Sequence, residues 1–197
     1  MKLTITLLVP ILLVLAAFNC STGGGEINYS SAPPSSRVQD CASVARYAPT
    51  KDANEPVHSW LGLIPLKTTR LDVEHVLGKA KWSHGSTFVY ETACERVDVV
   101  YSKGACEVSE VYRYDVPANV VIRFEIAPKQ KITLDDLKLT QSYVRQQESH
   151  PANSVQYRSR EDGIRIDALI DNNVETVTVL TYEPRAKDKD RECSPVK

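Results

Sequence analysis

The clearest helical period in the hydrophobic pattern of the chain lies within residues 62–82. Four apolar residues form a stripe at helical spacing: Leu71, Val73, Val76 and Leu77. Thr69 and Asp72 have the spacing of a capping box, and Gly78 can end the helix in a left-handed conformation. The pattern therefore predicts a helix of about nine residues, which is too short to be stable in water without packing on another element.

After this helix the apolar period changes from 3.6 to 2, which is typical of strands. The strands that it predicts are residues 87–91, 96–101, 120–126, 154–159, 164–170 and 174–182. In the third of these, strict alternation places one apolar set on a single face, namely Val120, Ile122, Phe124 and Ile126. Turn residues at 162–163 and 171–173 indicate that the last three strands form an antiparallel meander.

The order of elements suggests an internal repeat, because Thr133 and Asp136 restate the Thr-x-x-Asp spacing of the first helix. The first copy reads Thr-x-x-Asp-Val-x-x-x-Leu-Gly, and its matching residues are Thr69, Asp72, Val73, Leu77 and Gly78. This motif, followed by antiparallel strands, resembles the tandem helix-plus-sheet layout of β-lactamase inhibitor proteins and of outer-membrane assembly lipoproteins of the BamE (SmpA/OmlA) type. We therefore expect an α+β fold: two short helix-plus-antiparallel-strand repeats that form a mostly antiparallel sheet, with helices on one face.

The composition of the N-terminal region predicts export. Residues 1–20 combine a basic residue with an apolar run of about a dozen residues, the size of a signal-peptide core. Cys20 is a lipidation candidate, and the alternative is cleavage to a soluble periplasmic or secreted form. Residues 21–55 are rich in Ser and Pro and are predicted to be a flexible arm. Residues 56–197 are expected to be one domain, with halves at 62–127 and 128–183 and a charged tail at 184–197.

Five cysteines leave four once Cys20 is set aside, and four thiols in an exported chain indicate two disulfides. If Cys94 lies in a hairpin loop and Cys106 beyond the next strand, the two are about 20 Å apart, too far to be bridged. The preferred pairing is therefore Cys41–Cys94 with Cys106–Cys193. Cys41–Cys106 with Cys94–Cys193 stays open as the alternative.

Charge and motifs argue against several classes of function. With 24 basic and 25 acidic residues, the chain lacks the basic excess that nucleic acids or anionic lipids require. The four histidines have no metal-ligand spacing, and no nucleophile elbow, phosphate loop or dinucleotide motif is present, so we expect no metal, no cofactor and no catalytic residues. Asp135 and Asp136 are better explained as first-turn helix acids than as an acid–base pair.

Nine tyrosines against three phenylalanines and two tryptophans suit a sheet with one wet face. We expect a contact surface at Trp82, Tyr112, Arg113 and Tyr114. The function predicted first is a non-enzymatic protein-binding or structural module of the bacterial cell envelope. Its partner would be another envelope or secreted protein, and any membrane contact would go through Cys20. The alternatives are a secreted inhibitor of an extracytoplasmic enzyme, and an enzyme whose composite site no motif reveals.

Overall fold

The computed structural model describes residues 41, 46–47, 50–51, 58–107, 113–139, 142–146 and 153–193. The chain divides into two units, Met1–Arg37 and Val38–Lys197, and all of these residues belong to the second. The predicted signal peptide with Cys20, most of the predicted arm, Tyr112 and His150 lie outside the described residues. No helix within the described ranges is long and apolar enough to cross a membrane.

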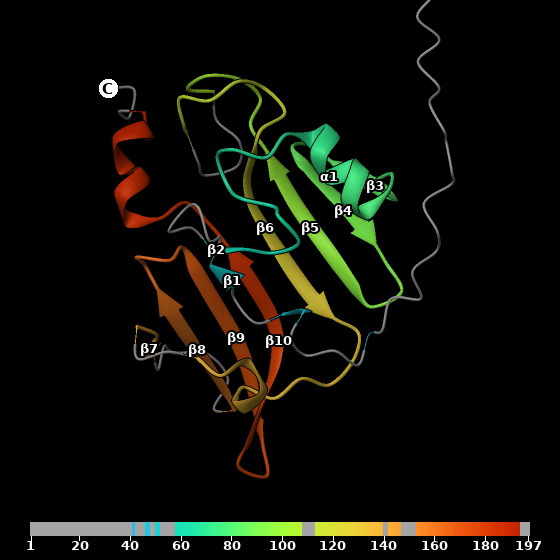
Figure 1. Cartoon of the computed structure of the whole chain (residues 1–197), viewed down its shortest axis with the longest axis vertical. Helices are drawn as coiled ribbons and strands as arrows, with labels where there is room; N and C mark the ends of the chain where they lie inside the picture. Colours follow the sequence, from blue (N-terminus) through green and yellow to red (C-terminus); the bar gives the residue numbers. More distant parts are fainter. Residues whose placement is uncertain are drawn as a thin grey trace, which may run out of the picture. The chain divides into compact units, whose positions relative to one another are not determined.

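One antiparallel sheet of eight strands, in the order β3-β4-β5-β6-β10-β9-β8-β7, makes up most of this unit (Figure 1). The first four of these in that order are β3 (Trp82–His84), β4 (Thr87–Glu91), β5 (Glu95–Tyr101) and β6 (Val121–Pro128). The others are β7 (Val144–Gln146), β8 (Ser154–Ser159), β9 (Ile164–Asp171) and β10 (Val174–Tyr182). A separate pair, β1 (Thr50–Lys51) with β2 (His58–Ser59), precedes them.

The prediction of an α+β fold with two helix-plus-strand repeats is wrong. Among the described residues the only α-helix is α1 (Arg70–Leu77), and the fold is predominantly β. The second Thr-x-x-Asp motif leads only into a three-residue 3-10 turn, η2 (Asp135–Leu137), which ends where Lys138 turns left-handed at φ 48°. β6, in the first predicted half, pairs with β10, in the second, in the middle of one continuous sheet.

The register of the strands separates an apolar face from a charged one. One cross-strand row on the first face is Phe88, Val99, Phe124, Tyr182 and Ile164. The neighbouring row on the other face is Val89, Asp98, Glu125, Thr181, Arg165 and Arg158. Because side chains alternate along a strand, the apolar rows gather into a single core on one side of the sheet.

The strict alternation predicted for residues 120–126 does not hold. Tyr101 pairs with Val121 but Val100 pairs with Arg123, so Ile122 is an extra residue in a β-bulge. The bulge shifts the pleat by one position. Val121 therefore joins the main core, while Val120 and Ile122 enter a second cluster with Leu66, Val100 and Val116.

Helix α1 packs on the apolar face over β4 and β5, with Val73 fully buried in the core. Its predicted capping box is present: the Thr69 hydroxyl accepts from the Asp72 N–H, and the Asp72 carboxylate accepts from the Thr69 N–H at 2.8 Å. The predicted apolar stripe is only partly right, because Leu71 is 77% exposed and Val76 37%. Leu77 packs against the core beside Val73, so the buried line has i, i+4 spacing.

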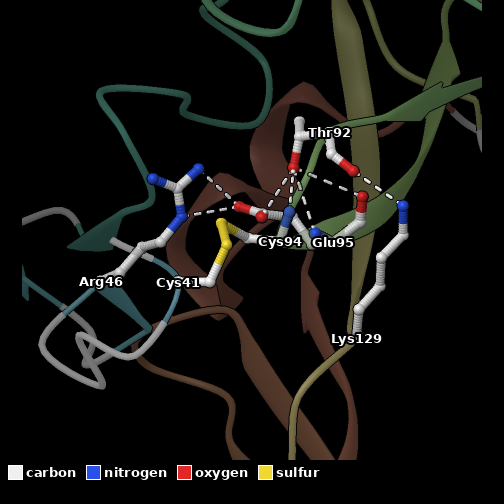
Figure 2. Close-up of a disulfide and its surroundings, with 6 residues drawn as sticks. All are labelled: Cys41, Arg46, Thr92, Cys94, Glu95 and Lys129. Atoms are coloured by element: carbon white, nitrogen blue, oxygen red, sulfur yellow. Dashed lines mark hydrogen bonds and ion pairs between the residues drawn. A yellow bond between two sulfur atoms is a disulfide. The ribbon is translucent and has the colours of Figure 1, made fainter. Parts of the chain in front are cut away.

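The N-terminal part of the described chain is fastened to the start of β5 (Figure 2). Cys41 and Cys94 form a disulfide, and the Arg46 guanidinium binds Glu95 with Nε and Nη2 at 2.7 and 2.6 Å from Oε1. The Glu95 side chain is fully buried, and its other oxygen accepts from the Thr92 hydroxyl at 2.8 Å. A buried carboxylate needs such partners, because an unpaired charge in the interior is strongly unfavourable. We call this group the Glu95 clamp.

Tyr47, next to the clamp, is fully buried although the sequence places it in the arm. It lies in the core together with Trp60, whose ring centroid is 6.2 Å from that of Phe124. Burial and the nearby Glu95 charge raise the pKa of Tyr47 to about 12. The second disulfide joins Cys106 to Cys193, so the two bridges follow the pairing preferred from the sequence.

Candidate functional site: a groove between a strained turn and α1

A two-residue turn at Leu61 and Gly62 begins the stretch that leads into α1. Trp60 and Leu63 exchange both backbone hydrogen bonds across it, at 3.3 and 2.9 Å. Both central residues have positive φ, 52° for Leu61 and 80° for Gly62, which is typical of a type I′ hairpin turn. Glycine or asparagine suits such positions, whereas a bulky leucine is a backbone outlier there. Leu61 is also 39% exposed, so burial of its own side chain does not explain the strain.

The turn and α1 enclose an open groove of about 410 Å³. Its apolar lining consists of Leu61, Leu63, Ile64 and Val76. Its polar lining consists of Lys67, Thr68, Asp72 and His75. Apolar and polar side chains thus share the lining, as they do in protein-binding patches.

Local hydrogen bonds hold both walls of the groove in place. On the loop side, the Ile64 N–H donates to the Thr68 hydroxyl at 2.7 Å, and the Thr68 N–H returns to the Ile64 carbonyl at 3.0 Å. On the helix side, the capping hydrogen bonds with Thr69 lower the pKa of Asp72, so its carboxylate stays ionised in the groove lining. A groove with such walls needs little reordering when it binds a partner.

The described residues among those predicted to bind do not line this groove, and Trp82 lies on a different element from Arg113 and Tyr114. Trp82 is 48% exposed on the edge strand β3, with the Arg96 guanidinium 5.7 Å from its ring. Arg113 donates from Nε to the Cys106 carbonyl at 3.0 Å, next to the second disulfide. Tyr114 bridges Glu192 through the backbone and lines another pocket.

Sequence reasoning missed Leu61, Ile64 and Val76 as groove residues. Two sequence signals bear on these positions. The first is the Leu-Gly pair between Trp60 and Leu63, which is consistent with a hairpin turn. The second is the place of Val76 on the helix, three residues after Val73: Val73 is the buried residue of α1, so Val76 can lie at the edge of the buried face. Neither signal shows that the turn and the helix face each other across a hollow.

Of the two acids weighed as an acid–base pair, Asp136 has structural partners. Asp136 accepts from the Thr133 N–H at 2.9 Å and from its hydroxyl at 2.6 Å, and these bonds lower its pKa. Within the described part of the chain, no three His, Cys, Asp or Glu side chains gather closely enough to hold a metal ion.

The chain matches no protein-family model, no curated protein and no solved structure, so the groove is interpreted from its own geometry.

Proposed function

We propose that the protein is a non-enzymatic binding module of the bacterial cell envelope, and that its partner is a protein that inserts an apolar side chain into the groove between Leu61 and Val76. The observation that carries this proposal is the exposed leucine at positive φ. An outlier of this kind persists where the surrounding structure enforces it, and such outliers cluster at functional sites. A partner side chain on Leu61 and Val76 would bury apolar surface that the free protein exposes to water.

Two disulfides support a location in an oxidising compartment, as expected for an exported chain. The shape of the site favours a binding module over an inhibitor, because Leu61 and Val76 line a hollow, which suits a protruding side chain of a partner. An inhibitor would instead be expected to fill a hollow in its target enzyme.

The test is site-specific photocrosslinking in intact cells, with a benzophenone amino acid placed at position 61, 76 or 71. Leu71 is the matched control. It lies on α1 together with Val76, is more exposed than either Leu61 or Val76, and is not part of the groove lining. We expect one partner band at positions 61 and 76 and none at 71. Equal crosslinking at all three positions would contradict the proposed site.

Affinity for the identified partner then gives a second, quantitative test. Leu61→Asn suits the positive φ and removes the apolar contact, so it should weaken binding by about tenfold or more, as for other buried interface anchors. Leu71→Asn should leave binding unchanged. If Leu61→Asn binds as tightly as the wild type, the turn is not the contact site.

A further inference from the structure

A second pocket, of about 400 Å³, lies beside the 3-10 helix η3 (Ala186–Arg191). Five charged side chains and Tyr114 dominate its lining, the charged ones being Arg158, Arg160, Glu183, Arg185 and Glu192. Tyr114 is one of the contact residues predicted from the sequence. The pocket therefore places an aromatic ring among charges of both signs.

Two of the three arginines are already neutralised. Arg158 binds Glu183 with Nη2 and Nε at 2.5 and 3.1 Å from one carboxylate oxygen. Arg185 binds Asp188 in bidentate fashion at 2.9 and 3.0 Å, and the arginine is only 11% exposed. These pairs fix their guanidinium groups and leave little net charge to attract a ligand.

Arg160 and Glu192 are different, because neither side chain has a hydrogen-bond or ion-pair partner among the described residues. Both are exposed, and both line the same pocket. In the part of the chain that the structure describes, the pocket thus presents one cation and one anion that no other side chain compensates.

The backbone places these two charges at opposite ends of η3. The Arg160 carbonyl accepts from the N–H of Ala186, the first residue of η3, at 2.9 Å, and Glu192 directly follows its last residue. Six residues of 3-10 helix at about 2 Å per residue separate the two ends by roughly 12 Å. The Glu192 end is held by the bridge to Tyr114 and by the Cys106–Cys193 disulfide.

We propose that this pocket binds an extended peptide segment of mixed charge, with its acidic residue on Arg160 and its basic residue on Glu192. An extended chain rises about 3.3 Å per residue, so the acid and the base would be about four positions apart. A simple anion or cation fits less well, because it would meet an uncompensated charge of its own sign in the same pocket.

The test is a titration of the ¹⁵N-labelled full chain, both disulfides intact, with short Gly/Ser peptides followed by NMR. One peptide carries a Glu and a Lys four positions apart, and two others carry the Glu or the Lys alone. We expect amide shifts at Arg160, Tyr114 and Ala186 that saturate at lower concentration with the mixed peptide. Each exposed ion pair should contribute up to about fivefold in affinity.

Variants separate the two contacts. Arg160→Gln should remove the gain in affinity that the Glu of the peptide gives, and Glu192→Gln should remove the gain in affinity that the Lys of the peptide gives. Lys131→Gln, at an exposed lysine outside the pocket lining, is the control and should change neither. Leu61→Asn should also leave this titration unchanged, which separates this site from the groove beside α1. Equal affinity for the three peptides, or shifts confined to other residues, would overturn the proposal.

Discussion

Arg46→Met is expected to be among the most destabilising single substitutions of a partly exposed side chain, because it leaves the Glu95 carboxylate buried without its cation. The arginine side chain is 14% exposed and the glutamate is not exposed at all. Removing one partner of a buried ion pair typically costs 3–5 kcal/mol. Here the Thr92 hydroxyl still donates to the carboxylate, so we expect about 3 kcal/mol. That loss is a large fraction of the roughly 5–15 kcal/mol by which domains are stable.

The measurement is equilibrium unfolding in urea, followed by circular dichroism with both disulfides intact. The double variant Arg46→Met/Glu95→Met removes both charges, and we expect it to be more stable than Arg46→Met alone. Arg145→Met is the matched control: its ion pair with Glu175 lies at the surface, with the arginine 51% exposed. That control should lose at most about 1 kcal/mol. If the double variant loses as much unfolding free energy as Arg46→Met and Glu95→Met lose together when measured singly, the two charges are not a coupled buried pair.

Three further predictions concern stability. Replacing both Cys41 and Cys94 by Ala should cost about 4 kcal/mol in the same unfolding assay, since the bridge closes a loop with a sequence separation of 53, and a loss below about 1 kcal/mol would contradict this. Gly163→Ala should be far more destabilising than Gly85→Ala. Both glycines have positive φ, but only at Gly163 would the new Cβ lie 2.2 Å from a backbone carbonyl oxygen. Equal urea midpoints for the two variants would contradict this prediction. Tyr47 should lower stability as pH rises above about 10, where an unfolded tyrosine ionises while the folded one, with a pKa of about 12, does not. Tyr47→Phe should therefore flatten the fall of the unfolding free energy between about pH 10 and 12, and an unchanged slope would contradict this.

The strands were the most predictable part of the fold. Residues 87–91, 154–159 and 174–182 form strands with the predicted bounds, because each has a clear apolar period and flanking turn residues. The capping box at Thr69 was equally legible, because it depends on two side chains three residues apart.

Features that depend on neighbours in space were not predictable. β3 and β7 have three residues each, too few to show a period, and form only by pairing at the sheet edges. The bulge at Ile122 is set by its pairing with β5 and reverses the face that Val120 and Ile122 occupy. The prediction of a second helix-plus-strand repeat was wrong for a related reason. A Thr-x-x-Asp motif marks where a helical turn begins and says little about how long the helix is.

The candidate site shows the same limit. The aromatic composition predicted a contact surface that includes Trp82 and Tyr114, but these two residues lie on separate elements. The groove at Leu61 comes from a leucine in a turn conformation that its side chain disfavours, and a sequence window gives no φ angle. Of the predicted contact residues that the structure describes, only Tyr114 lines one of the two pockets discussed above.

The order of the disulfides has a consequence for how the chain oxidises. Of the four bridged cysteines, the first pairs with the second and the third with the fourth along the chain. With Cys20 set aside, a chain that emerges from a pore with its N-terminus first presents Cys94 to Cys41 before Cys106 and Cys193 appear. Four cysteines allow three pairings. Only the native one arises when neighbouring thiols join in order of arrival, so a general oxidant suffices and thiol reshuffling is not required.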